Sequence, residues 1–488
     1  MSKLARAVSP TLASFLLILQ FLNVSAAQEA DVAVTIDPAA ALARVTGVRA
    51  SGESKERRNF YFVTPQGVAT DLGERIWDVR FAGADGAVVE ARRLVPGEYL
   101  AAGDFVSWSY TISLKPHKNQ SAAAHASWLN VENGLLMFDD LLPQNTGPVN
   151  LRLTVPAGWQ IFSPDAAGTA PMRFDDPSRA VIFVGNNLRS AKTQVDGVSL
   201  EFVTAGKWLF TDAEALAMAG EIYSEYRKLF GAQHASEAQI NVVRFPGEVA
   251  PGSWQAETRG RSLTIVSSDM NFRTQSLQRL HEQLRHEMFH LWLPNAVNLT
   301  GRYDWFYEGF ALYQSLKTAV FLNRIRFDDF LDTLSRAYSI DSRQQDRMSL
   351  VEASQSRTVG DDTRIYARGM LIAFLTDLSL LESSKGRSSV SDLLKAVYSR
   401  HRPPAAPADG TGAVIDAMEG IGVSRTVVDR YINGSGPIEW NNELASAGIE
   451  PPNAVTRTGL TVTPKPNGRQ KALLNKLGYN NWRKLSAK

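Results

Sequence analysis

The sequence predicts a multidomain α+β protein, with an N-terminal antiparallel β domain followed by a mainly helical domain. The chain has 488 residues, which is too long for one ordinary hydrophobic core. Apolar and polar residues alternate in the first half, whereas apolar residues recur at helical spacing after Thr211. The composition, with 44% hydrophobic and 21% charged residues, is typical of a globular protein.

The beginning of the chain has the layout of a secretory signal peptide. Lys3 and Arg6 precede an apolar run from Thr11 to Val24, and small residues follow. The run is short for a membrane helix, and an uncleaved anchor is the alternative interpretation. We therefore expect residues 1–27 to be removed and the mature protein, without a transmembrane span, to be exported to the periplasm or secreted.

Charge and cysteine content exclude several classes of function. Without Lys3 and Arg6 the chain carries 50 basic and 50 acidic residues, so nothing in the balance predicts a nucleic-acid partner. The chain has no cysteine, which excludes disulfides, thiol nucleophiles and sulfur-ligated zinc.

Residues 28–205 are predicted to form the β domain. In DFVSWSYTISLK, every second residue is apolar, as expected for a sheet with one buried face. Similar alternation occurs at Trp77, Val79, Phe81, Val149, Leu151, Leu153 and Val155. His117 and His125 have no partner at ligand spacing, and we interpret both as surface histidines.

The helical pattern begins with a predicted capping box of Thr211 and Glu214, in a helix that ends at Gly231. INVVRF and SLTIVSS follow as two predicted strands. Further helices are predicted over Gln275–Leu293, from Asp304, from Tyr366 and over Ser391–Arg400.

The stretch RHEMFHLWLP contains the strongest chemical signal. His286 and His290 lie four residues apart on a predicted helix, on a face about 140° from its apolar seam. That seam consists of Leu277, Leu280, Leu284, Met288 and Leu291. Two imidazoles at this spacing can bind one tetrahedral Zn²⁺, with Glu287 placed to take a proton from water. Two surface histidines beside an acid are the alternative.

A catalytic zinc needs a third protein ligand, and Glu308 in DWFYEGFALY is the candidate. Gly309 beside it would permit a close helix approach. Asp304 and Glu282 compete for the role, but Asp304 suits the N-cap of the second helix and Glu282 precedes the motif. The sequence thus predicts one Zn²⁺ per chain.

HEMFH followed by WFYEGFALY resembles the gluzincin metallopeptidases, and more narrowly the glycyl aminopeptidase family. RIYARGMLIAFLTDLSL resembles the Tyr-x-Lys-Gly helix of that family, with Arg368 in place of the lysine. The resemblance implies a thermolysin-like peptidase domain in which Tyr366 stabilises the oxyanion of a tetrahedral intermediate. A buried tyrosine that begins an apolar helix is the alternative.

The resemblance extends to LTVPAGW in the β domain and to DRYINGSGPIEWNNELASAGIE, but it also has departures. The spacing from His290 to Glu308 is shorter than is usual in the family. The family's Gly-Gly-x-Glu-His stretch is echoed only by WQAETRGRS, in which Glu257 would bind the α-amino group of a substrate. A solvent-facing acid on an edge strand is the alternative for Glu257.

The peptidase domain is predicted over residues 206–450, followed by a basic tail over residues 451–488 with eight Lys or Arg and no acid. Many relatives continue into a PDZ domain, for which the tail is too short. The tail is expected to be mobile or to form a short appended helix, with weak contact to an anionic surface as a further possibility.

These observations predict zinc-dependent hydrolysis of peptide bonds, with a peptide as the partner molecule. Aminopeptidase action on short peptides is what the resemblance implies. Two alternatives stay open: an endopeptidase, and a binding or assembly protein that keeps the peptidase fold without activity.

Overall fold

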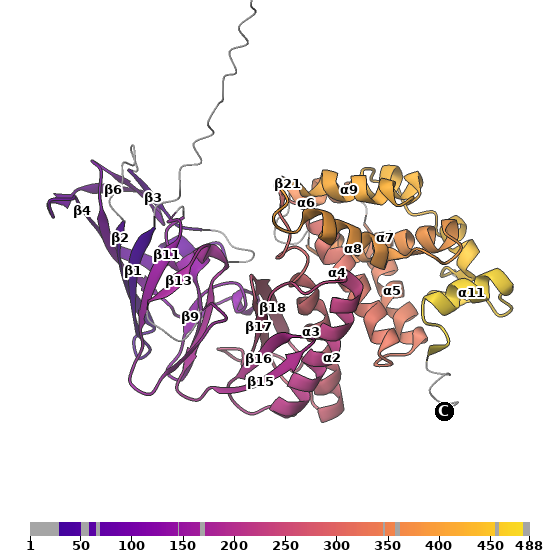
Figure 1. Ribbon diagram of the computed structural model, residues 1–488, viewed down its shortest axis with the longest axis horizontal. Helices are drawn as coiled ribbons and strands as arrows, with labels where there is room; N and C mark the ends of the chain where they lie inside the picture. The colour runs from indigo at the N-terminus through magenta and orange to yellow at the C-terminus, as the bar shows by residue number, and fades with distance from the viewer. Residues whose placement is uncertain are drawn as a thin grey trace, which may run out of the picture.

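The computed structural model describes residues 29–49, 58–64, 69–144, 146–165, 171–344, 347–356, 362–453 and 458–481. The predicted signal peptide, residues 1–27, lies outside these ranges. The N-terminal part is built from β sheets and the C-terminal part from helices, as predicted (Figure 1).

The first sheet has seven strands in the order β13-β11-β1-β2-β8-β4-β5. Its strands are β1 (Ala30–Asp37), β2 (Leu42–Arg49), β4 (Ile76–Ala82), β5 (Val88–Val89), β8 (Ser107–Ser113), β11 (Val149–Thr154) and β13 (Met172–Phe174). All neighbours pair antiparallel except β1 and β11, which are parallel. A small sheet at its end contains β3 (Asn59–Tyr61), β6 (Ala91–Val95) and β7 (Glu98–Ala101).

The predicted alternation holds in β8, where Trp108, Tyr110 and Ile112 are buried. It is wrong in β4, because Trp77 is exposed while Ile76 and Phe81 are buried. The register of β4 against β8 shifts between Trp77 and Arg80, where Asp78 has a φ of 53°. The extra residue of such a bulge moves the following side chains to the opposite face, so a strict period of two fails here.

A second sheet lies between the first sheet and the third. Its strand order is β12-β14-β10-β9. The strands are β9 (Trp128–Leu129), β10 (Asn133–Met137), β12 (Gln160–Phe162) and β14 (Val181–Gly185). Leu136 and Ile182 pack into the core shared with the first sheet, whereas Leu135 and Phe183 pack against the third. This double-sided burial explains why β14 is apolar throughout.

The third sheet carries residues of the predicted site. Its order is β15-β16-β17-β19-β18, and β18 is its edge strand. The strands are β15 (Arg189–Val195), β16 (Val198–Thr204), β17 (Glu237–Arg244), β18 (Trp254–Arg259) and β19 (Ser262–Ser267). The sheet thus includes residues 189–204, ahead of the domain boundary predicted near residue 205.

Two helices, α2 (Asp212–Phe230) and α3 (Arg273–His290), cover one face of the third sheet (Figure 1). The second sheet packs against its other face. The capping box of Thr211 and Glu214 is present, and Gly231 ends α2 with a φ of 74°, as predicted.

The remaining helices complete the helical part. They are α4 (Asp304–Phe321), α5 (Phe327–Ser342), α6 (Leu350–Gln355), α7 (Asp362–Ser383), α8 (Val390–His401), α9 (Gly410–Gly420) and α10 (Trp440–Leu444). Helix α4 packs against both α3 and α7. α1 (Phe138–Leu141) is a single turn in the β region. Short strand pairs join β20 (Leu299–Thr300) to β21 (Ala408–Asp409) and β22 (Ile449–Glu450) to β23 (Thr461–Val462).

The basic tail contains a short helix, α11 (Gly468–Lys476). Its side chains Leu473 and Leu474 are buried, and the backbone NH of Leu460 donates a hydrogen bond to Ser335 in α5. The appended helix is therefore confirmed, and the described part of the tail packs on the helical domain.

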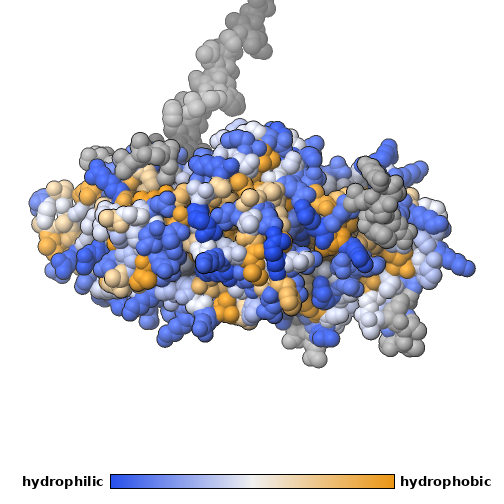
Figure 2. All heavy atoms as spheres, turned by 90° about the horizontal axis from the view of Figure 1, so that it is seen from below, coloured by the Kyte–Doolittle hydropathy of each residue, from blue (hydrophilic) through white to orange (hydrophobic). Residues whose placement is uncertain are grey.

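Hydrophilic residues cover most of the face shown in Figure 2, and apolar residues lie there in small separate patches. Among the described residues, no helix combines the length and the apolar character needed to span a membrane.

Candidate metal centre

Helix α3 presents the two histidines at its C-terminal end. The predicted apolar seam is confirmed, since Leu280, Leu284 and Met288 are buried in the main core. His286 and His290 are also buried, on the side of α3 that faces α4. Packing of the seam therefore sets the rotation of α3, and this rotation directs both imidazoles toward Glu308.

The structure brings His286, His290 and Glu308 together. The Nε2 atoms of the two histidines are 3.3 Å apart. Glu308 Oε2 lies 3.4 Å from Nε2 of His286 and 3.6 Å from Nε2 of His290. Ligand atoms at the corners of a tetrahedron around zinc, with bonds of about 2.0–2.1 Å, are separated by about 3.3–3.4 Å. The spacing of the three atoms therefore fits one Zn²⁺, and no other such group occurs within the described ranges.

The surroundings of the three side chains also suit a cation. His290 Nδ1 donates a hydrogen bond to the carbonyl oxygen of Leu293 at 2.9 Å, so Nε2 is the ring nitrogen that faces Glu308. Glu308 Oε2 is buried and accepts no hydrogen bond from the described residues. Burial opposes charge on His290, but the Glu308 carboxylate outweighs burial and raises the pKa of His290 to about 9. Burial likewise opposes charge on Glu308, yet the nearby histidines lower its pKa.

Glu287 lies beside this cluster, with Oε1 3.9 Å from Nε2 of His286. Its Oε2 accepts a hydrogen bond of 2.8 Å from Oγ1 of Thr258 on β18. Burial raises the pKa of the Glu287 carboxyl group, while the two histidines act against this rise. A buried carboxylate held in this position can accept a proton from a water molecule at the cluster.

Glu308 is on α4, one residue before the point at which α4 crosses α7. A Cβ atom on Gly309 would lie 2.5 Å from backbone atoms of Gly369, so the crossing requires glycine. Tyr366 is half-buried and lies on α7, three residues before Gly369. Asp304, the predicted N-cap, is instead the first residue of α4, and Tyr303 is the N-cap.

Glu257 lies on the edge strand β18 and is paired through both carboxylate oxygens. Nδ1 of His125 lies 2.8 Å from its Oε2, and Nε of Arg259 donates a hydrogen bond of 2.7 Å to its Oε1. Burial opposes ionisation of Glu257, but Arg259 and His125 outweigh burial and lower its pKa to about 2. The side chain is still 25% exposed. Glu257 thus already has two partners within the protein and keeps part of its surface exposed.

His125, which we interpreted as a surface histidine, has a side chain that is 29% exposed and lies against Glu257. His125 follows the short helix at Gln120–Ala122 in the β region, and tertiary packing places it against β18. Burial lowers the pKa of His125, but the hydrogen bond and charge of Glu257 outweigh burial and raise it. His117, in contrast, lies with its Nε2 2.9 Å from Oδ1 of the exposed Asp71, and its Nδ1 accepts a hydrogen bond of 3.0 Å from the backbone NH of Asn119.

Asn295 connects the loop after α3 to β18. Its Nδ2 donates hydrogen bonds to the carbonyl oxygens of Thr258 at 2.8 Å and His290 at 3.0 Å. Its Oδ1 accepts a hydrogen bond of 3.0 Å from the backbone NH of Gly260. One side chain therefore holds the backbone of two residues of the site.

Sequence reasoning missed Thr258, Arg259 and Asn295. The sequence did contain a signal for Thr258. Strand alternation in WQAETR puts Thr258 and Glu257 on opposite faces of β18, so only one of them can face α3. No spacing rule connects Glu257 to His125, which is 132 residues away.

No family model and no curated protein matches this sequence. Solved structures do resemble it. An aminopeptidase N family protein from Idiomarina loihiensis superposes with a TM-score of 0.73 at 15% identity, over 90% of this chain and 82% of that one. An M1 zinc metallopeptidase from Deinococcus radiodurans gives a TM-score of 0.56 at 14% identity, over 84% and 94%. A mutant of that enzyme bound to a Tyr-Ser-Ala substrate gives 0.55 at 14% identity, over 84% and 95%. At these identities the likeness concerns the fold, and the chain has the two-domain fold of M1 metallopeptidases.

Proposed function

We propose that this chain is a zinc metallopeptidase that acts as an aminopeptidase on short peptides. One observation carries the proposal: Nε2 of His286, Nε2 of His290 and Oε2 of Glu308 are 3.3–3.6 Å apart, at the spacing of zinc ligands. The fold supports it, since solved neighbours were bound to a Tyr-Ser-Ala substrate, to L-tryptophan and to L-arginine.

His286, His290 and Glu308 would hold one zinc ion per chain. When bound, zinc polarises a peptide carbonyl and lowers the pKa of water. Glu287 takes a proton from the attacking water and passes it to the leaving amine, while Thr258 holds the Glu287 carboxylate in place. The Tyr366 hydroxyl donates a hydrogen bond to the developing oxyanion.

Recognition of the substrate amine is assigned to Glu257. Its carboxylate is ionised at neutral pH and partly exposed, as an ammonium partner requires. The same carboxylate already accepts from His125 and Arg259, so the ammonium group would share it with two other donors. This crowding favours the second candidate function, an endopeptidase, which needs no amine anchor.

Hydrolysis of a peptide panel tests the proposal. Glycyl, alanyl and tyrosyl peptides with free amines would be compared with the same peptides carrying a blocked amine, because the motifs resemble those of glycyl aminopeptidases. We expect cleavage of the free-amine peptides only. Glu287→Gln should lower kcat by about 10²–10⁴-fold and retain one zinc per chain, because it removes the base but no ligand.

Glu282→Gln is the matched control, since Glu282 is on the same helix but exposed, in an ion pair with Arg279. It should leave both activity and zinc content unchanged. Cleavage of blocked peptides would replace the aminopeptidase by the endopeptidase. Absence of both zinc and turnover would refute the enzyme and leave the binding or assembly protein.

Export to the periplasm or the medium is part of the same proposal, and it is supported by the pattern of residues 1–27. Cell fractionation with N-terminal sequencing should find the exported protein starting near Gln28. A full-length protein retained in the cytoplasm would contradict it. Contact of the basic tail with an anionic surface would appear as cosedimentation with anionic vesicles, lost at high salt.

A further inference from the structure

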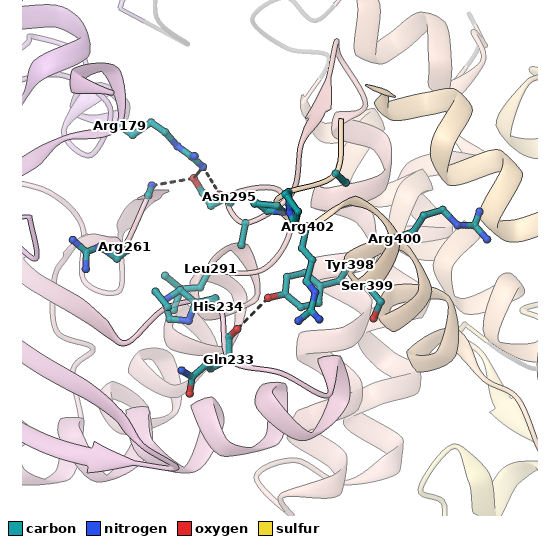
Figure 3. A pocket seen from close by; sticks show the side chains of 16 residues that line it. Arg179, Gln233, His234, Arg261, Leu291, Asn295, Tyr398, Ser399, Arg400 and Arg402 are labelled. Atoms are coloured by element: carbon teal, nitrogen blue, oxygen red, sulfur yellow. Dashed lines mark hydrogen bonds between the residues drawn. The ribbon is translucent and has the colours of Figure 1, made fainter. Parts of the chain in front are cut away.

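A cavity of about 720 Å³ lies at the tip of the β18–β19 hairpin (Figure 3). Its wall is formed by this tip, by the loop between α2 and β17, by the loop after α3 and by the end of α8. The three proposed zinc ligands and Glu287 do not line it. It adjoins the metal centre, because Leu291 of its wall directly follows His290 and Asn295 of its wall donates a hydrogen bond to the carbonyl oxygen of His290.

The polar side chains of this cavity are mostly hydrogen-bond donors. Four arginines line it, Arg179, Arg261, Arg400 and Arg402, together with His234, and no carboxylate does. A wall of this kind favours a negatively charged ligand. The volume falls within the range of about 300–1,000 Å³ that is usual for small-molecule sites.

The positive charges are not all compensated by protein carboxylates. Arg261 is paired with Asp165 at 2.5 Å and Glu237 at 2.7 Å, so its charge is offset. Arg402, in contrast, forms no ion pair with the described residues, and its guanidinium group lies 5.9 Å from the ring centre of Tyr398. Arg179 likewise has no carboxylate partner in the described ranges and donates hydrogen bonds to Asn295. The cavity therefore has an excess of positive charge.

His234 adds an unused donor. Burial and the nearby Arg261 lower the pKa of His234 to about 4, so its ring is neutral at pH 7. Nδ1 lies 3.1 Å from the hydroxyl of Tyr223, whose own pKa is raised, chiefly by burial. The hydroxyl can therefore donate to Nδ1, which puts the proton of the imidazole on Nε2. Nε2 is buried and has no partner among the described residues, and a donor in this state gains from an acceptor ligand.

We propose that this cavity binds a small organic anion, whose carboxylate or phosphate group contacts Nε2 of His234 and the guanidinium group of Arg402. The apolar part of the wall, which includes Leu291 and Pro404, would contact the rest of the ligand. Nothing in the proposed peptidase reaction requires this site, so the two proposals stand independently.

Calorimetric titration of the zinc-loaded full chain with inorganic phosphate and with succinate tests the site. Ionic strength is kept constant, and succinamide serves as the neutral analogue of succinate. We expect saturable binding of one anion per chain. The anion that binds with the higher affinity shows whether the cavity prefers a phosphate or a carboxylate group. Succinamide should not bind, because it lacks the charge that the cavity selects.

Two arginine variants separate a specific site from diffuse charge. Arg402→Gln should weaken anion binding at least tenfold. Arg425→Gln removes the same charge from an exposed arginine that does not line the cavity, so binding should change by less than about twofold. Both residues are exposed and lack ion pairs with the described residues, so both variants should fold.

Three results would overturn the proposal. One is the absence of saturable binding by either anion. Another is equal weakening by Arg425→Gln and Arg402→Gln, which would show a diffuse electrostatic effect. The third is binding that neither variant changes, which would place the anion elsewhere, for example at the zinc ion.

Discussion

Gly309 and Gly369 meet where α4 crosses α7, so closely that a Cβ atom on Gly309 would lie 2.5 Å from the backbone of Gly369. The contact joins the helix that carries Glu308 to the helix that carries Tyr366. The separation of a proposed zinc ligand from the proposed oxyanion donor therefore depends on two residues without side chains.

Gly309→Ala should push α4 away from α7, because backbone atoms cannot move aside as a flexible side chain would. We expect a loss of about 1–3 kcal/mol in the free energy of unfolding, together with a lower zinc content. Urea unfolding and metal analysis would measure both. Gly420→Ala is the control, since no heavy atom lies within 4 Å of its new Cβ. Unchanged stability and zinc content in Gly309→Ala would contradict the role of the crossing.

Thr258→Val should lower kcat about 5- to 30-fold without changing zinc content. The substitution keeps the shape of the side chain but removes the hydroxyl that lies 2.8 Å from Oε2 of Glu287, and one hydrogen bond to a charged group contributes about 1–2 kcal/mol. Steady-state kinetics with a free-amine peptide would show the change. Thr258→Ser should recover most of the activity, and failure to do so would point to packing as the cause.

The pairing of Glu257 predicts a pH dependence of stability. Its pKa falls from 4.5 to about 2 on folding, so the carboxylate stabilises the fold above pH 4.5 and loses this contribution as the pH falls toward 2. Between about pH 5.5 and about pH 3, wild type should lose about 2 kcal/mol more than Glu257→Gln. Urea unfolding of both proteins at the two pH values measures the difference. Equal losses in the free energy of unfolding of wild type and Glu257→Gln would show that Glu257 has an ordinary pKa in the folded protein.

Asp377 forms a buried ion pair with Lys317 at 2.6 Å and also accepts a hydrogen bond of 2.6 Å from Tyr313. Lys317→Met should lower the free energy of unfolding by about 3–5 kcal/mol, because it leaves an uncompensated charge in the core. Chemical denaturation would measure the loss. Lys228→Met is the control: Lys228 is exposed and pairs with Glu225, so a loss under about 1 kcal/mol is expected there. Equal losses in the two variants would refute this explanation.

Local pattern was sufficient for the elements that depend on nearby residues. The apolar seam of α3 and the capping box of α2 each involve residues within one helix, so their spacing can be read directly. The bulge at Asp78 could not be predicted in this way, because it depends on the register of β4 against β8.

The sequence by itself determined which residues could bind a metal. His286 and His290 lie on one face of a helix because of their spacing of four, and Glu308 follows on the next helix beside a glycine. Only the tertiary structure decided the surroundings: the hydroxyl of Thr258 on Glu287, the pairing of Glu257 with His125, and the cavity that adjoins the metal centre. The physical reason is the separation along the chain over which each effect acts. Helix periodicity fixes side-chain direction over a few residues, whereas contacts such as that of His125 with Glu257, 132 residues apart, arise only when separate sheets and helices pack.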